Sequence, residues 1–211
     1  MIEKILPSTE SKFRILKNVY MNPGINVTEL IRKSRVSPNL AVNYVNTLVH
    51  FGDLRERVVG KGKKPHVREL EPNLRSVLGR ITFVLVELEK KYEFAEKYKE
   101  FGPIFAQAED LFEGSGAEFC LIYGSFARFS AESESDVDVM VVGKLRKGER
   151  RELSEIFVTL GREYSIQVEG VRSFLRNSGD PFHRSILRDH VLVWNETRFV
   201  EMLSRIQNST P

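Results

Sequence analysis

The sequence predicts an α+β protein of two small domains, and two stretches of the chain carry that prediction. In residues 1–70, amphipathic helical segments precede two short strand segments, which are joined by a turn rich in lysine and glycine. Between Leu121 and Val142, an apolar strand, a Gly-Ser turn and a second apolar strand follow one another. We therefore expect helices and a β-hairpin in the N-terminal domain, and a mixed sheet with flanking helices in the C-terminal domain.

Three helices are expected before the hairpin, over residues 9–20, 26–34 and 38–51. Apolar residues recur at helical spacing in the first of them, and Thr28 lies near the cap of the second. Ser37 is the expected N-cap of the third helix, with Pro38 at its first position, and Gly52 ends this helix. Two helices joined by a tight turn predict a helix-turn-helix.

The strand segments at residues 54–59 and 66–70, with the turn 60–65 between them, complete a pattern that resembles the winged helix-turn-helix of many prokaryotic transcriptional regulators. That resemblance implies duplex DNA as a partner, with the third helix in the major groove and the hairpin as the wing. Base or sugar contacts are then expected from Ser37, Asn39, Asn43 and Asn46. Phosphate contacts are expected from Arg32, Lys33 and Arg35 and, at the wing tip, from Lys61, Lys63 and Lys64.

The N-terminal domain is the basic part of the chain. Residues 1–70 contain thirteen Lys and Arg against six Asp and Glu, a surplus of +7, whereas the whole chain carries +3. The remaining residues therefore carry −4, and this asymmetry favours nucleic acid as the partner of the N-terminal domain. The alternative stays open that the winged helix is a protein-docking module and that the lysine-rich turn is only the soluble end of a hairpin.

One long helix is expected from residue 73 to about residue 99. Apolar residues alternate along it by four and three, as in a coiled coil: Leu74, Leu78, Ile81, Leu85, Leu88, Tyr92 and Ala95. This stripe predicts a homodimer, because winged-helix pairs usually read two half-sites. In the alternative interpretation, the stripe packs on the chain's own winged helix or on the core of the C-terminal domain.

Asp136 and Asp138 alternate with valines at the start of the second apolar strand. Because successive side chains of a strand point to opposite faces, both carboxylates lie on one face while the valines pack into a core. Two neighbouring carboxylates are costly without a cation between them, and Mg²⁺ (or Mn²⁺) prefers such oxygen ligands together with substrate phosphates. The Gly-Ser turn adds a backbone that a phosphate can approach closely.

Tyr123-Gly-Ser, a gap of about ten residues and then Asp136-Val-Asp form a pattern that resembles the nucleotidyltransferase superfamily. This superfamily includes DNA polymerase β, and the likeness is strongest to its minimal, antitoxin-like members. The resemblance covers about residues 103–195. It implies a Mg²⁺-dependent transfer of a nucleoside monophosphate from an NTP, such as ATP, to an acceptor hydroxyl.

The resemblance also assigns residues. It implies that Asp136 and Asp138 bind the divalent metal and act in catalysis, and that Gly124 and Ser125 bind the triphosphate. Arg128 either reaches phosphate oxygens or pairs with a glutamate of the following loop, Glu132 or Glu134. Phe129 departs from the family, because many relatives have glycine at that position.

A third carboxylate is the point where the sequence departs furthest from the family. Relatives place this acid on a neighbouring strand, and on the candidate strand here Ser165 or Gln167 stands where the family would show it. Glu169 is our candidate for the third catalytic carboxylate, with Glu163 at the other end of the strand as the alternative. Loss of one acid would cost orders of magnitude in rate while leaving nucleotide binding in place.

The composition sets further bounds. Cys120 is the single cysteine, which excludes an intramolecular disulfide and fits a reducing cytosol. No apolar run approaches the length of a membrane span and the N-terminus lacks a signal-peptide pattern, so we expect a soluble cytoplasmic protein with no membrane partner. His183 and His190 have no metal-like spacing with each other or with the cysteine, so we interpret both as structural or surface histidines.

Three functions stay open. The first is a DNA-bound nucleotidyltransferase, and the second is a regulator in which a weakened transferase domain only binds nucleotide. The third is an antitoxin-like partner of a separately encoded toxin protein. The expected domains are residues 1–72 for the winged helix, 73–102 for a linker and dimerisation helix and 103–211 for the nucleotidyltransferase-like domain.

Overall fold

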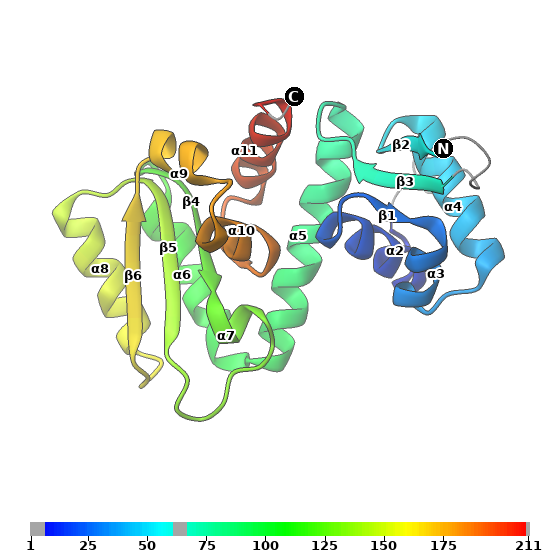
Figure 1. The fold of residues 1–211 in the computed structure, drawn as a ribbon. Coiled ribbons are helices and arrows are strands. Elements are labelled where there is room, and N and C mark those ends of the chain that lie inside the picture. Colours follow the sequence, from blue (N-terminus) through cyan, green and yellow to red (C-terminus); the bar gives the residue numbers. More distant parts are fainter. Residues whose placement is uncertain (1–6, 61–66, 210–211) are drawn as a thin grey trace. The chain divides into compact units, whose positions relative to one another are not determined.

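The computed structural model describes residues 7–60 and 67–209 (Figure 1). The chain divides into two compact units, residues 1–86 and 87–211, which we call the N-terminal and C-terminal units. The division falls inside the long helix α5 (Val77–Lys97). In the part of the chain that the structure describes, no helix has the length and apolar character needed to cross a membrane.

In the described residues before α5, the N-terminal unit combines three helices with a small antiparallel sheet of strand order β1-β3-β2 (Figure 1). Its elements before α5 are α2 (Glu10–Met21), β1 (Ile25–Asn26), α3 (Val27–Ser34), α4 (Pro38–Phe51), β2 (Leu54–Val59) and β3 (Val67–Pro72). Helices followed by a hairpin are the predicted winged helix-turn-helix arrangement. The expected wing-tip residues Lys61, Lys63 and Lys64 lie outside the described residues.

The helix boundaries of this unit follow their caps. Ser37 accepts a hydrogen bond from the backbone of Leu40 at the start of α4, and Gly52 ends that helix with φ 81°, as predicted. Asn26, instead of Thr28, caps α3, because its Oδ1 accepts a hydrogen bond of 2.9 Å from the backbone N–H of Glu29. The same residue belongs to β1, a two-residue strand too short to show in the sequence pattern.

One face of α5 packs into the core of the N-terminal unit. Phe83 is fully buried and stacks on Tyr20 at 4.9 Å between ring centroids. Thr82 Oγ1 donates a hydrogen bond of 2.6 Å to Oδ1 of the buried Asp53. Gly79 lets the helix approach closely, because a Cβ there would lie closer than 3.0 Å to the backbone oxygen of Asn73. The first half of α5 is therefore part of this unit.

The predicted heptad stripe lies mostly on another face of α5. Leu74, just before the helix, is buried, whereas Leu78, Ile81, Leu88 and Tyr92 are exposed. Leu85 and Ala95 are half-buried. These exposed residues are compatible with the predicted homodimer, which stays a prediction.

The C-terminal unit is built on a four-stranded mixed sheet of order β6-β5-β4-β7, in which β5 and β6 are parallel and the other pairs antiparallel (Figure 1). Its strands are β4 (Gly116–Tyr123), β5 (Val137–Lys144), β6 (Tyr164–Glu169) and β7 (Val191–Trp194). Its helices after α5 are η1 (Lys99–Phe101), α6 (Gly102–Phe112), α7 (Gly124–Ala127), α8 (Lys147–Val158), α9 (Val171–Asn177), α10 (Pro181–Arg188) and α11 (Glu196–Ser209). The α+β fold class predicted from the sequence is confirmed.

Each face of this sheet has its own apolar cluster. Alternate residues of β5, Val137, Val139 and Val141, pack with α6 and α8 on one face. Met140 and Val142 pack with α9, α10 and α11 on the other. Asp138 alternates in step with Met140 and Val142 along β5, so its carboxylate is on the face of α9 to α11.

Cys120 is fully buried on β4, and this burial raises the pKa of its thiol.

We predict that Gly79→Ala lowers the free energy of unfolding by about 1–3 kcal/mol, because the added methyl group meets the backbone of Asn73 in a packed interior. Urea unfolding followed by circular dichroism measures the change. Gly148→Ala on α8 is the matched control, since a Cβ there meets nothing within 4 Å. Equal stability of the two variants would contradict the close packing of α5 on the N-terminal unit.

Candidate functional site

The predicted site residues come together where β4 ends and β5 and β6 begin. Tyr123, the last residue of β4, is paired with Asp138 of β5, and Asp138 is paired in turn with Ser165 of β6. Paired residues of neighbouring strands point to the same face. Asp136 stands two residues before Asp138 and is exposed, whereas Asp138 is half-buried. The strand alternation predicted from the sequence therefore holds at Asp138, whereas Asp136 lies just before β5.

Gly124 makes room for the Asp138 carboxylate. The glycine has φ 76°, a conformation that residues with a Cβ rarely adopt. A Cβ at this position would lie closer than 3.0 Å to Oδ2 of Asp138. The turn that starts α7 and the second aspartate of the pair thus fit together only because residue 124 has no side chain.

The electrostatics at Asp138 favour a bound cation. Burial raises the pKa of the Asp138 carboxyl and the charge of Asp136 raises it further, whereas a hydrogen bond from Ser165 and the charge of Arg128 lower it. A divalent cation would neutralise both carboxylates and relieve their repulsion. Mg²⁺ is commonly held by one or two carboxylates with phosphate oxygens completing its shell, so this pair fits it. Within the described residues, no third His, Cys, Asp or Glu joins them in a metal-binding group.

The start of α7 and Arg128 provide groups that suit an anion. The first N–H groups of a helix have no partner within the helix, and Gly124 and Ser125 begin this one. Arg128 directly follows α7, is exposed, and lies near enough to lower the pKa of Asp138. Within the described part of the chain it forms no ion pair with Glu132 or Glu134, which leaves its guanidinium available to a ligand.

Ser165, one of the two residues at which the sequence resemblance would place a third acid, is opposite Asp138. Its Oγ donates a hydrogen bond of 3.0 Å to Oδ1 of Asp138. Glu169, our sequence-based candidate, is paired with Val142 and so lies about 13 Å further along the strand than Ser165, at 3.3 Å per residue. The placement expected for Glu169 is therefore wrong. The sequence could not settle this point, because the register between two strands is not visible in the local pattern of either.

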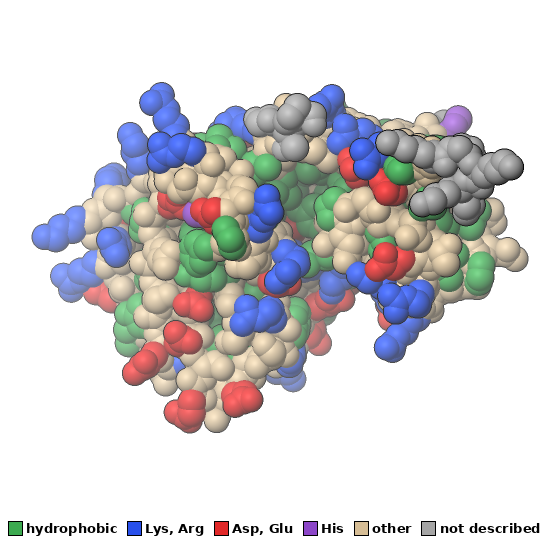
Figure 2. All heavy atoms as spheres, viewed as in Figure 1, with side chains coloured by type: hydrophobic (Ala, Val, Ile, Leu, Met, Phe, Trp, Pro, Cys, Tyr) green, Lys and Arg blue, Asp and Glu red, His purple; other side chains and the backbone are tan. Residues whose placement is uncertain are grey.

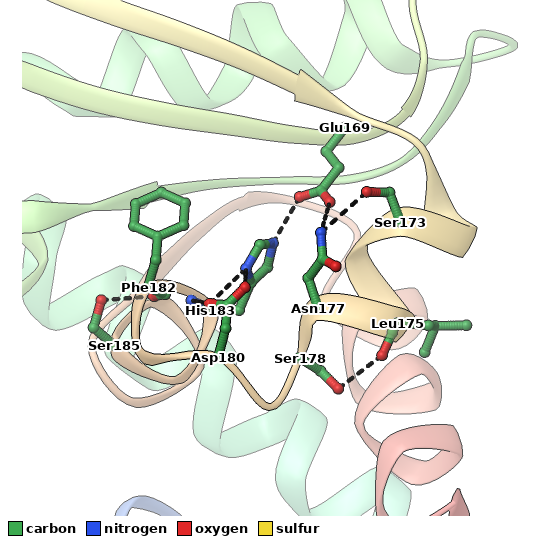
Figure 3. Close-up of polar contacts among 9 residues, drawn as sticks. All are labelled: Glu169, Ser173, Leu175, Asn177, Ser178, Asp180, Phe182, His183 and Ser185. Carbon is green, nitrogen blue, oxygen red and sulfur yellow. Dashed lines mark hydrogen bonds and ion pairs between the residues drawn. The ribbon is translucent and has the colours of Figure 1, made fainter.

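Glu169 belongs to a separate polar cluster (Figure 3). Its Oε2 lies 2.8 Å from Nε2 of His183, and the Nδ1 atom of this buried histidine lies 3.0 Å from both carboxylate oxygens of Asp180. Asn177 donates a further hydrogen bond to Glu169 at 3.3 Å. Asp180 also caps α10 through the backbone N–H of His183 at 2.8 Å. The cluster fixes the first turn of α10 to the end of β6.

Phe129 has a left-handed backbone conformation, which glycine adopts more readily than other residues. Its φ is 58°, in the left-handed region that is costly for a residue with a Cβ. The carbonyl oxygen of Phe129 accepts a hydrogen bond of 2.6 Å from Nζ of Lys97, and its ring lies 6.0 Å from that of Phe94. The ring is thus packed against α5 within the C-terminal unit, and these contacts offset the cost of the backbone conformation.

The predicted DNA-binding residues of the N-terminal unit are exposed on two consecutive elements. Those outside the undescribed turn are Arg32, Lys33, Arg35, Ser37, Asn39, Asn43 and Asn46, and each is exposed. Asn39, Asn43 and Asn46 are spaced by four and three, so they share one face of α4. Arg68 of β3 donates a hydrogen bond of 2.8 Å to Asn46 and so joins the hairpin to α4. The surface is polar and basic, as DNA recognition requires.

No family of known proteins and no curated protein matches the chain. Among solved structures, the chain is similar to one described as "Crystal structure of the toxin-antitoxin with AMP-PNP", with a probability of 1.00 and 17% sequence identity. The likeness covers 47% of this chain and 83% of that one, with a TM-score of 0.31. At this TM-score the likeness carries no argument about fold or function.

We predict that the stability supported by His183 falls as pH rises. Burial lowers the pKa of His183, but its hydrogen bonds with Glu169 and Asp180 outweigh burial and hold the pKa above the ordinary 6.5. Because the pKa of His183 is higher in the folded state, its contribution to stability is full below pH 6.5, the ordinary pKa of histidine. The contribution is lost as pH rises through the folded-state pKa. The advantage of wild type over His183→Gln should therefore shrink as pH rises above 6.5.

Fluorescence of Trp194, the single tryptophan, follows the unfolding of the C-terminal unit in this experiment. His50→Gln serves as the control, because His50 is exposed on α4 in the other unit. A difference between wild type and His183→Gln that is constant over the pH range would contradict a charged His183.

Proposed function

We propose that the protein is a DNA-binding regulator whose C-terminal unit binds a Mg²⁺–NTP, with ATP as the first candidate. One observation carries this proposal: Asp138 lies against Gly124 and opposite Ser165, so its carboxylate meets the Gly-Ser turn while a hydroxyl lies opposite it on β6. This arrangement supports binding of a metal–nucleotide complex better than its turnover.

Each residue of the site has a part in binding. Asp136 and Asp138 would hold Mg²⁺ or Mn²⁺, which when bound supplies positive charge against the triphosphate. The backbone of Gly124 and Ser125 presents N–H groups at the start of α7, and Arg128 adds a guanidinium that can pair with phosphate oxygens. Ser165 holds Asp138 in place through its hydrogen bond.

Turnover would need more than these groups. A third carboxylate would help to complete the metal site and to activate the acceptor hydroxyl. Ser165 has no carboxylate, and its hydroxyl donates its hydrogen bond to Asp138. Removal of one stabilising group from a transition state costs roughly a hundred- to a thousandfold in rate. A domain of this kind retains nucleotide and is suited to sensing it.

A second candidate function is nucleotidyl transfer with Glu163 as the third acid. Val137 donates a backbone hydrogen bond of 2.9 Å to the carbonyl oxygen of Glu163, at the first paired position of β5 and β6, Val137 with Tyr164. Asp136 and Glu163 directly precede these two strands. This observation favours Glu163 over Glu169 if the domain is an enzyme.

DNA binding rests on the N-terminal unit by itself. Its exposed asparagines on α4 have the side-chain amide that pairs with adenine in the major groove, and basic side chains flank them on α3. We propose that nucleotide occupancy changes DNA affinity, because α5 has residues in the cores of both units: Phe83 in the first and Phe94 in the second.

We predict that the protein binds ATP in a Mg²⁺-dependent manner and that Asp136→Asn with Asp138→Asn abolishes this binding. Amide oxygens cannot neutralise the cation, and one lost charge-assisted contact already costs about 1.5–3 kcal/mol. Isothermal titration calorimetry measures the affinity. Glu132→Gln with Glu134→Gln is the matched control, since it removes the same charge from exposed positions of the same loop.

Incubation of the protein with labelled ATP, Mg²⁺ and cell extract separates the two functions. We expect a sensor to release the labelled ATP unchanged. A labelled acceptor that disappears in Glu163→Gln would support the transferase instead. Unchanged ATP binding in the double aspartate variant would overturn the site itself, whichever of the two functions holds.

We predict salt-dependent binding of duplex DNA, and a smaller salt dependence in Arg32→Ala with Lys33→Ala. Each lost phosphate contact lowers the slope of log affinity against log salt by about 0.9. Fluorescence anisotropy with labelled genomic fragments at several salt concentrations gives this slope. Lys147→Ala with Arg151→Ala on α8 is the control of equal charge, and equal slopes in the two variants would contradict DNA binding through α3.

A further inference from the structure

Phe182 has an exposed aromatic ring at the edge of the candidate site. Of the phenylalanines in the described residues, it is the one with more than a third of its surface exposed, at 43%. The others are buried or half-buried. Because 43% of its surface is exposed, Phe182 forgoes part of the roughly 1.5–3 kcal/mol that full burial of a large apolar side chain contributes, and the core of the C-terminal unit does not account for the exposed part.

The ring lies beside the turn that carries the phosphate-binding groups. Phe182 and Tyr123 make an edge-to-face contact, with 5.8 Å between ring centroids and 87° between ring planes. Tyr123 directly precedes Gly124 and is paired with Asp138. One ring therefore separates Phe182 from the aspartates, on the face of the sheet that α10 covers. Figure 2 shows apolar side chains at the surface over α10, with charged side chains around them.

The backbone on both sides of Phe182 is fixed. Pro181 precedes it as the first residue of α10, and the next residue, His183, is held by Asp180 and Glu169 (Figure 3). The carbonyl oxygen of Phe182 accepts a hydrogen bond of 2.7 Å from Ser185 Oγ. An exposed ring on an anchored first turn is pre-organised, so a ligand that meets it loses little free energy in ordering it.

We infer that Phe182 is the platform on which the base of the bound nucleotide stacks. This inference rests on the proposed function, since it requires a triphosphate at Gly124, Asp136 and Asp138. The cluster of Glu169, His183 and Asp180 is then a positioning device for the platform. Stacking accepts any base, because every base has an aromatic face, so Phe182 selects nucleotides over inorganic phosphates and does not select among nucleotides.

The test compares ATP with inorganic tripolyphosphate, each with Mg²⁺, as ligands of wild type and Phe182→Ala. We expect the variant to bind ATP about 5- to 140-fold more weakly, the effect of one lost base–aromatic stack. Its affinity for tripolyphosphate, which has no base, should equal that of wild type. Phe182→Trp should restore ATP binding, and GTP, CTP and UTP should lose affinity in Phe182→Ala as ATP does.

The control is Val158→Ala on α8, which removes an exposed apolar side chain of the same unit. Equal ATP affinity in wild type and Phe182→Ala would overturn the platform while leaving the metal–phosphate site intact, and would fit a ring that contacts a protein acceptor. An equal loss for ATP and tripolyphosphate would also overturn it, because the ring would then support the site structurally. If the wild-type protein binds neither ATP nor tripolyphosphate, that result overturns the proposed function together with this inference.

Discussion

The close fit of the Asp138 carboxylate against Gly124 is the constraint on which the rest of the candidate site depends. It fixes the backbone of the turn, because only glycine combines φ 76° with the absence of a Cβ at that point. It also fixes the register of β4 and β5, in which Tyr123 is opposite Asp138. This contact positions the rest of the site: the aspartate pair, the first turn of α7 and the ring of Tyr123.

Several elements could be predicted because their signals are local. Alternating valines of β5 placed Asp138 on the face opposite to their own, and Ser37 with Gly52 marked both ends of α4. Two things depend on pairing between distant segments and could not be predicted. One is the register that puts Ser165, and not Glu169, opposite Asp138. The other is the contact of Phe182 with Tyr123, which comes from a helix almost sixty residues away.

The prediction for His183 and the prediction for its neighbour Glu169 had different outcomes. His183 was expected to be a structural or surface histidine, and it is buried between two carboxylates. Glu169 was expected at the metal, yet its carboxylate is occupied by His183 and Asn177. Because the same acid cannot serve both places, Glu169 does not complete the pair of Asp136 and Asp138, and this supports the proposal of nucleotide binding without turnover.

The metal–nucleotide site can be tested by a crystal structure grown with Mn²⁺ and a non-hydrolysable ATP analogue, because Mn²⁺ scatters anomalously and takes the same oxygen ligands as Mg²⁺. We expect an anomalous peak between the carboxylates of Asp136 and Asp138, with the triphosphate against the backbone of Gly124 and Ser125. Density that shows both carboxylates solvated, with metal and nucleotide absent or bound elsewhere, would contradict it.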